Sequence, residues 1–346
     1  MRRQHAEARA RLPEPAYDYF AGGAGDEVTL AENEQAWQHV WLRPRQLLGL
    51  GAADASLELL GAAMAAPIVL APVATHGLLH PDGELAVARA AADAGLVMCL
   101  STRATTDLAD VAAATTAAKW FQLYMDIDRD RVRRILERVQ AHGYGQIVMT
   151  IDLPVAGRRE RERRHGPVPF PEGVALATHL GDQADGGVKP VVGGWHAPTW
   201  EDVAWVAQAS GVPVMLKGGL TAEDALLAEQ AGASAVVVSN HGARQLDGVV
   251  PTAVALPEVA AALAGRLPVL VDGGIRSGVD VVRALALGAD ATLVGRPYLW
   301  ALAAGGREGV SEALAALVED TERTLALVGA ERPADVRREH VRLRAW

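Results

Sequence analysis

From Pro67 onward the sequence repeats one unit, in which a short apolar run ends on a small or polar residue and a longer stretch with helical spacing follows. Several of these stretches, at 221–224 and 277–280 for example, begin with a hydroxyl residue followed by acidic residues, as helices often do. Eight such alternations predict a (β/α)8 TIM barrel, and the lack of an early glycine-rich dinucleotide fingerprint disfavours a doubly wound sheet. The eight apolar runs are 67–72, 96–101, 119–124, 146–152, 213–218, 235–240, 268–273 and 291–296.

Three segments lie outside the repeat, within what we expect to be one domain over 1–346 with its barrel at 67–300. Residues 1–66 are predicted to form an N-terminal helical extension, and residues 301–346 C-terminal helices. The segment at about 157–198, between the fourth and fifth strands, is rich in glycine, proline and charge, which predicts a mobile loop. Because such a loop leaves from the catalytic face of a barrel, we expect an active-site lid; an insertion without function is the alternative.

Composition narrows the class of protein. Hydrophobic residues make up 50% of the 346 residues and charged residues 22%, so the chain should fold around a substantial core. A net charge of −9 without an extended basic tract argues against a nucleic-acid partner. The single cysteine, Cys99, is expected to be a buried structural thiol, and no histidine spacing predicts a metal site. With no signal peptide and no apolar run of about 18 residues, we expect a cytoplasmic protein that does not enter membranes.

Polar residues or glycines stand at nearly every predicted strand end. Because the carboxyl ends of barrel strands meet at one face, this convergence predicts a large cofactor across the barrel mouth. After the last two strands, glycines allow backbone N–H groups to approach a ligand and two arginines add positive charge, which predicts a phosphate site. The residues concerned are Pro72, Val73, Ala74, Ser101, Gln122, Tyr124, Thr150, Asp152, Lys217, Asn240, His241, Asp272, Gly273, Gly274, Arg276, Gly295 and Arg296.

The run at 236–248 carries a buried-strand pattern into His241, and Arg244 follows three residues later. Histidine exchanges protons near neutral pH, and the arginine fork matches a carboxylate, so the pair suits a substrate with both a hydroxyl and a carboxylate. Asp152 could orient the imidazole, as in a catalytic triad, or cap a helix. Lys217, at the end of the fifth strand, could form a Schiff base or place a cation beside an electron-accepting ring.

Taken together, these residues resemble the FMN-dependent 2-hydroxy acid oxidase and dehydrogenase family, to which glycolate oxidase, lactate oxidase and the mandelate-oxidising enzymes belong. The resemblance covers almost the whole chain, and its joint motifs are specific. It rests on segments 17–24, 121–124, 151–152 with 157–160, 239–247, 272–276 and 295–297.

The resemblance implies a role for each substrate-facing residue. His241 would be the base that takes a proton from C2 of the substrate or from its hydroxyl, with Asp152 stabilising the imidazolium. Tyr19 and Arg244 would hold the substrate carboxylate, and Tyr124 would hydrogen-bond the hydroxyl. Arg159 would lie at the mouth of the site, near the lid.

The resemblance also implies FMN as the cofactor, O2 or another compound as the electron acceptor, and a homo-oligomer, since tetramers are common in the family. Lys217 would stabilise negative charge on the reduced flavin. The remaining cofactor residues fall into two groups. The flavin ring would lie against Pro72, Val73, Ala74, Ser101, Gln122 and Thr150, and the phosphate end of the site would contain Asp272, Gly273, Gly274, Arg276, Gly295 and Arg296.

One position departs from the family pattern. Where short-chain oxidases of the family often carry tryptophan after a Ser/Thr pair, this chain has Arg103 after Ser101 and Thr102. An inward-pointing Arg103 could pair with a second anionic or strongly polar group, which predicts a substrate larger or more polar than glycolate. In the alternative, Arg103 turns outward to a helix or to the lid.

Two other functions compete with the flavoenzyme hypothesis. A cofactor-free phosphate-binding barrel, a lyase or isomerase with Lys217 as the nucleophile, would explain the barrel and the phosphate site but not His241 with Arg244. A non-catalytic flavin-binding protein would explain the cofactor residues but not the intact set of His241, Arg244, Lys217 and Tyr124.

Overall fold

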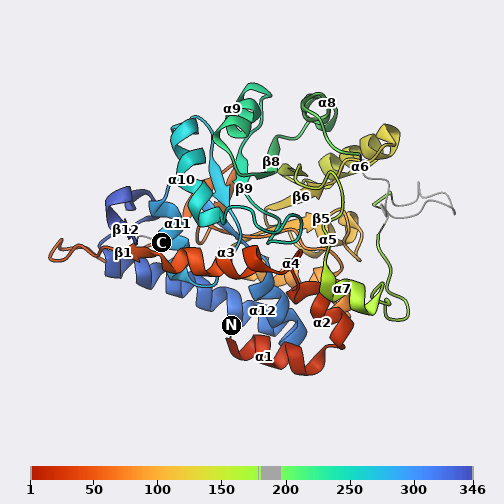
Figure 1. Cartoon of the computed structure of the whole chain (residues 1–346), viewed down its shortest axis with the longest axis horizontal. Coiled ribbons are helices and arrows are strands. Elements are labelled where there is room, and N and C mark those ends of the chain that lie inside the picture. Colours follow the sequence, from red (N-terminus) through yellow and green to blue (C-terminus); the bar gives the residue numbers. More distant parts are fainter. Residues whose placement is uncertain (1, 178, 181–195, 345–346) are drawn as a thin grey trace.

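The computed structural model describes residues 2–177, 179–180 and 196–344, and its centre is a closed barrel of eight parallel strands (Figure 1). Each strand coincides with one of the eight predicted apolar runs, with β8 extending one residue beyond its run, so the predicted barrel is confirmed. Pairing of Thr292 with Ile68 and of Leu293 with Val69 joins the last strand to the first. The strands are β4 (Ile68–Leu70), β5 (Val97–Ser101), β6 (Lys119–Leu123), β7 (Gln146–Thr150), β8 (Val214–Gly219), β9 (Val236–Val238), β10 (Val269–Val271) and β11 (Ala291–Val294).

The strands are apolar throughout because both of their faces are covered. One set of alternate side chains, including Val69, Cys99, Trp120 and Met215, packs together as a separate cluster from the larger core. The other set belongs to the larger core that includes residues of the surrounding helices. Cys99 is buried and its pKa is raised by that burial, which agrees with the expected structural thiol.

Helices follow the strands around the barrel. Two of the predicted helix starts are confirmed, because the hydroxyls of Thr221 and Ser277 accept hydrogen bonds from backbone N–H groups three residues later. The helices are α4 (Gly83–Asp93), α5 (Leu108–Ala114), α6 (Arg129–Ala141), α8 (Trp200–Ser210), α9 (Ala222–Gln230), α10 (Thr252–Leu263), α11 (Gly278–Ala286) and α12 (Arg296–Val328), with a short 3-10 turn η1 (His76–Leu78) before α4.

The N-terminal extension is helical only over its first part, in α1 (Arg2–Arg11), α2 (Glu14–Ala21) and α3 (Val28–Gln38). The expectation of helix up to residue 66 was wrong for the rest. There, β1 (Val40–Leu42) pairs with the C-terminal β12 (Val341–Leu343), and β2 (Leu57–Leu59) forms a hairpin with β3 (Ala62–Met64). The two hairpin-turn residues, Leu60 and Gly61, both have positive φ, as a tight type I′ turn requires. Ala62 and Met64 pack in the cluster with Val69 and Cys99, so the hairpin adjoins the barrel strands.

The predicted loop at about 157–198 contains a helix, α7 (Glu160–His165), which the sequence analysis did not predict and which packs against α2. Residues 178 and 181–195 of the predicted lid lie outside the described residues. At the C-terminal end, α12 begins at Arg296 and has a break in its helical backbone at Gly305 and Gly306, and the 3-10 turns η3 (Pro333–Asp335) and η4 (Arg338–His340) follow it. Figure 1 shows α1 and α12 packed together on one side of the barrel. Among the described helices, none has the length and apolar character needed to span a bilayer.

Candidate active site

A cavity opens at the carboxyl ends of the barrel strands, where the sequence predicts the site. Of the predicted site residues, all line this cavity except Asp152, Ser101 and Asn240. Asp152 and Ser101 contact lining residues from behind, and the Asn240 amide pairs with that of Asn33. Side chains and backbone that line the cavity come from Tyr19, Phe20, Ala71, Pro72, Val73, Ala74, Arg103, Gln122, Tyr124, Thr150, Leu153, Ala156, Arg159, Lys217, His241, Gly242, Arg244, Asp272, Gly273, Gly274, Ile275, Arg276, Leu293, Gly295, Arg296 and Leu299.

His241 follows β9 and lies in the left-handed region of backbone space, with φ 57°. A non-glycine residue there is strained, and such strain collects at functional sites. Ser239 Oγ accepts a hydrogen bond from the His241 backbone N–H at 3.1 Å, which helps to hold the turn. The ring is fixed at both nitrogens: Nδ1 lies 2.8 Å from Asp152 Oδ1, and Nε2 lies 3.4 Å from the Tyr124 hydroxyl.

Asp152 follows β7 and reaches His241 past β8. Gly218 of β8 allows this approach, since a Cβ at that position would lie 2.6 Å from the Asp152 side chain and the φ of 124° suits glycine. Burial opposes ionisation of Asp152, but the neighbouring His241 and Lys217 outweigh it and hold the pKa of the carboxyl below its usual value. Asp152 is therefore an anion that can stabilise a protonated imidazole.

Tyr124 stands after β6, and burial raises the pKa of its phenol to about 12, with the charge of Asp152 adding to the effect. The hydroxyl is therefore protonated at neutral pH and can serve as a neutral hydrogen-bond donor toward the cavity.

Lys217, in β8, is 5% exposed and meets two partners across the barrel mouth. Its Nζ lies 2.8 Å from Asp272 Oδ2 and donates to Ser239 Oγ at 2.7 Å. Burial alone would lower the pKa of Lys217, but the carboxylates of Asp272 and Asp152 raise it above its usual value. A lysine held as a cation cannot act as a Schiff-base nucleophile without first losing its proton, so the geometry favours the second of the two predicted roles.

Ser101, predicted to lie against the cofactor, instead positions a neighbour that does line the cavity. The Ser101 hydroxyl donates to Gln122 Oε1 at 3.1 Å, and the Gln122 amide donates to Thr150 Oγ1 at 3.0 Å. This chain crosses the ends of β5, β6 and β7 and fixes which face of the amide is presented to a ligand. Ser101 is thus a support for the cavity wall rather than part of its surface.

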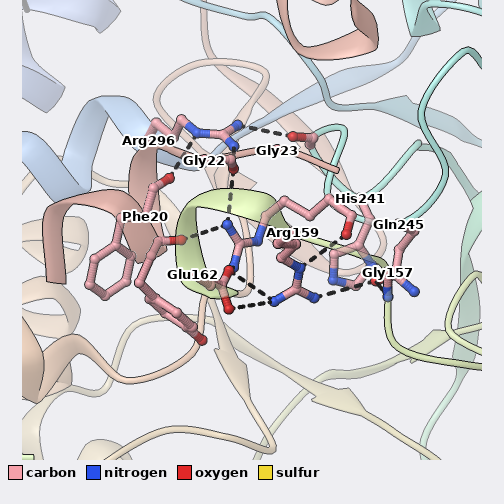
Figure 2. Close-up of polar contacts among 12 residues, drawn as sticks. Phe20, Gly22, Gly23, Gly157, Arg159, Glu162, His241, Gln245 and Arg296 are labelled. Atoms are coloured by element: carbon pink, nitrogen blue, oxygen red, sulfur yellow. Dashed lines mark hydrogen bonds and ion pairs between the residues drawn. The ribbon is translucent and has the colours of Figure 1, made fainter. Parts of the chain in front are cut away.

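Arg244 and Arg159 share one carboxylate that the sequence analysis missed, that of Glu162 in α7. Arg244 donates to Glu162 at 2.9 Å and Arg159 at 3.2 Å, and Figure 2 shows the Glu162–Arg159 pair. Arg244 also donates to the backbone carbonyls of Tyr19 and Gly22, and its guanidinium lies 5.0 Å from the centre of the Tyr19 ring. The only sequence signal for this contact was the pair of glutamates within the charged run 158–164.

Two further arginines line the cavity, Arg276 after β10 and Arg296 at the N-terminus of α12, and Arg296 shares the Gly22 carbonyl with Arg244. Arg296 donates to the carbonyls of Phe20, Gly22 and Gly242 (Figure 2), and burial lowers its pKa to about 9, which leaves it a cation at neutral pH. Arg276 donates to Glu34 at 2.7 Å. Both arginines line the cavity beside Gly274 and Gly295. A helix N-terminus flanked by two cations suits a phosphate.

The residues fit FMN. Apolar and amide groups line one part of the cavity, Lys217 supplies a buried cation, and the α12 end supplies an anion site. In addition, Asp272 Oδ1 is buried and finds no hydrogen-bond partner among the described residues, as expected of an acceptor placed for a ligand hydroxyl. Asp272, predicted as a cofactor residue, thus also holds Lys217 through its other oxygen.

Within the part of the chain that the structure describes, one group outside the cavity has ligand atoms close enough together to hold a metal ion. Glu14, Asp18 and His165 place one potential ligand atom each within 4.8 Å of one another. The Asp18 carboxylate is already paired with His165 at 2.9 Å and with Arg161 at 3.8 Å. We therefore interpret the group as the contact that joins α2 to α7.

A (β/α)8 barrel whose mouth holds an imidazole paired with a carboxylate, a buried lysine and two arginines at a helix N-terminus is suited to a flavin-dependent oxidoreductase. Comparison with known proteins identifies the family. The family model described as FMN-dependent dehydrogenase matches residues 8–343. The chain belongs to this family and is an FMN-dependent oxidoreductase.

Characterised relatives cover nearly the whole chain. Glycolate oxidase 1 of Zea mays is 44% identical over 97% of this chain and 93% of its own length. L-lactate oxidase of Nostoc sp. is 41% identical over 95% and 94%. Among solved structures, a mandelate oxidase variant with (S)-mandelic acid is 41% identical, has a TM-score of 0.92, and is matched over 100% of this chain and 98% of that one. Another mandelate oxidase variant, with an FMN adduct, has the same identity and TM-score over 99% and 100%.

Proposed function

We propose that this enzyme oxidises an L-2-hydroxy acid to the 2-oxo acid, with His241 as the base. The observation that carries the proposal is the placement of His241 Nε2 at the cavity, with Nδ1 bound to the Asp152 carboxylate and Arg244 three residues away in the same turn. The glycolate, lactate and mandelate oxidases named above act on 2-hydroxy acids, which supports the same reaction class here.

His241 would accept the substrate proton, and Asp152 would stabilise the charge that His241 then carries. With Nδ1 donating to Asp152, Nε2 of the neutral ring carries the lone pair and can accept one proton, from C2 of the substrate or from its hydroxyl. The imidazolium that forms is stabilised by the Asp152 anion 2.8 Å away. Bound FMN supplies the two-electron acceptor for the substrate and passes the electrons to O2, giving H2O2, or to another acceptor.

The other side chains bind and orient the substrate. Arg244, stacked on Tyr19 and held by Glu162, would take the carboxylate, and Arg159 would add charge at the mouth of the cavity. Tyr124, neutral and 3.4 Å from His241 Nε2, would donate to the substrate oxygen as it becomes a carbonyl. Lys217, kept protonated by Asp272, would stabilise negative charge on the cofactor. Pro72, Val73, Ala74, Gln122 and Thr150 would line the ring.

The test is anaerobic. Purified enzyme loaded with FMN is mixed with a panel of L-2-hydroxy acids, and the flavin absorbance is followed before and after oxygen is readmitted. Bleaching by at least one member, lost in His241→Gln, supports the proposal. Failure of every member to bleach a bound flavin would favour a non-catalytic flavin-binding protein instead. A protein that takes up no FMN, and in which borohydride traps a substrate on Lys217, would favour the lyase or isomerase.

We further propose a cytoplasmic homotetramer that acts on a substrate larger or more polar than glycolate. The tetramer rests on the family resemblance, the location carries over the expectation drawn from the sequence, and the substrate rests on Arg103 at the cavity wall. Light scattering of the purified enzyme tests the tetramer, and a species other than four chains would contradict it.

A further inference from the structure

The cavity is far more positive than the chain that forms it. The protein has a net charge of −9, yet among the residues that the structure describes six cationic side chains line the cavity, together with the carboxylate of Asp272. Glu162 and Glu34, which pair with three of these cations, lie behind the lining. The cationic side chains are those of Arg103, Arg159, Lys217, Arg244, Arg276 and Arg296. Such a concentration predicts ligands with several negative charges in total.

Five of these cations have a task in the proposed function. Arg276 and Arg296 lie at the phosphate end, and Lys217 is paired with Asp272 at the cofactor wall. Arg159 and Arg244 share Glu162 and face the substrate carboxylate. FMN and a substrate with one carboxylate therefore account for every cation except Arg103.

Arg103 lines the cavity on the side of β5 and β6. It follows β5, which is separated from β11 by β4 and lies beside β6, so it is displaced around the mouth from the arginines that follow β10 and β11. Tyr124, which follows β6, lines the same cavity and interacts electrostatically with Arg103. The Arg103 charge acts to lower the pKa of the Tyr124 phenol, against burial, which raises it.

The backbone around Arg103 is held in place. The Arg103 N–H donates to Ser101 Oγ at 3.1 Å, and its carbonyl accepts from the Thr75 N–H at 3.0 Å. Two residues on, Thr105 bonds the buried Glu84 carboxylate through both its N–H and its hydroxyl. A side chain carried on so constrained a turn is positioned in advance, which is how specificity contacts gain affinity.

We propose that Arg103 is a specificity-determining residue that binds a second, distal carboxylate, so that the preferred substrates are 2-hydroxy diacids. The inference rests on the proposed function and deepens it. The guanidinium offers a planar pair of donors that matches a carboxylate. The tryptophan that short-chain oxidases of the family often carry at this position is neutral and offers no such pair. The diacid's first carboxylate binds Arg244, and its second binds Arg103.

Matched pairs of substrates test the proposal. The enzyme is assayed with L-2-hydroxybutanoate against L-2-hydroxybutanedioate, and with L-2-hydroxypentanoate against L-2-hydroxypentanedioate, whose members differ only by a methyl in place of a carboxylate. We expect the diacid of at least one pair to have the higher kcat/KM. Arg103→Gln should lower the diacid-to-monoacid ratio roughly 10- to 100-fold, the range for a lost charge-assisted contact. Arg158→Gln is the control, because Arg158 is exposed beside the site and does not line the cavity.

A binding measurement separates specificity from turnover. Affinities for 2-oxopentanoate and 2-oxopentanedioate, followed through the flavin absorbance, should show the same Arg103-dependent preference for the diacid. The inference is wrong, while the proposed function stands, if monoacids bleach the flavin and Arg103→Gln leaves the diacid-to-monoacid ratios of kcat/KM and of affinity unchanged. It is also wrong if Arg158→Gln lowers these ratios as much as Arg103→Gln does. If neither class bleaches the flavin, the inference is wrong, and the wider panel of L-2-hydroxy acids then decides whether the proposed function holds.

Discussion

Nδ1 of His241 lies 2.8 Å from Oδ1 of Asp152, and this contact joins the ends of two strands, β9 and β7, that are separated in the barrel by β8. The bond fixes which imidazole nitrogen faces the cavity. It also places a buried anion behind His241, the proposed base, where the anion would favour a protonated ring.

Asp152→Asn should therefore lower kcat roughly 10²- to 10⁴-fold, because the amide can present the wrong hydrogen-bonding group to Nδ1 and carries no charge. FMN content should be unchanged, since Asp152 does not line the cavity. Stopped-flow measurement of flavin reduction checks the prediction. Asp107→Asn is the matched control, because Asp107 caps α5 and pairs with Arg138 away from the cavity. If Asp107→Asn lowers kcat as much as Asp152→Asn does, the loss does not come from the contact between Asp152 and His241.

Tyr124→Phe should lower kcat by about 10- to 100-fold through loss of one hydrogen bond to the substrate oxygen. Because burial raises the pKa of Tyr124 to about 12, the hydroxyl stays protonated throughout the range in which the enzyme can be assayed. The variant should consequently keep the shape of the wild-type pH profile between pH 5 and roughly 10. Loss of an alkaline limb in the variant would show that Tyr124 titrates, and would contradict its role as a neutral donor.

Lys217 and Asp272 form a buried ion pair whose partners should be tested together. Lys217→Met leaves the Asp272 carboxylate buried without its cation and should destabilise the fold by about 3–5 kcal/mol. Lys217→Met with Asp272→Leu removes both charges and should cost less than the sum of the two single changes. Urea unfolding after removal of FMN is measured for the wild type, Lys217→Met, Asp272→Leu and the double variant, which together form a double-mutant cycle. If the loss of stability in the double variant equals the sum of the two single losses, the two groups do not interact.

Much of the site could be predicted because most of its residues lie at or just after the end of a barrel strand, a position that the sequence pattern identifies. Each barrel strand presents its last residues at the same face, so identifying the eight apolar runs was enough to group His241, Lys217 and Asp272. Glu162 was missed because it lies in α7, outside the repeat of strands and helices, and its contact with Arg244 depends on α7 packing against α2. The hairpin at Leu57–Met64 was missed because each of its strands has only three residues, too few for periodicity to distinguish from other structure.

The Arg103 turn also depends on a distant group, the Glu84 carboxylate, which is completely buried. Glu84 accepts hydrogen bonds from the backbone N–H groups of His76 and Thr105 and from the hydroxyls of Thr105 and Thr106. Burial opposes its ionisation, but His76 and these hydrogen bonds outweigh it, so the pKa of Glu84 lies below its ordinary value of 4.5.

Because the pKa is lower in the folded protein than in the unfolded chain, ionised Glu84 stabilises the fold fully above pH 4.5, and this contribution is lost as the pH falls through the folded-state pKa. Glu84→Gln keeps one acceptor but loses the charge, and should cost about 1–3 kcal/mol at pH 7. Its deficit against wild type should shrink as the pH is lowered below 4.5. Urea unfolding from pH 7 to pH 3.5 measures this, with the exposed Glu58→Gln as a control that should follow wild type at each pH. A deficit that stays constant across the range would show that the Glu84 charge does not hold these loops together.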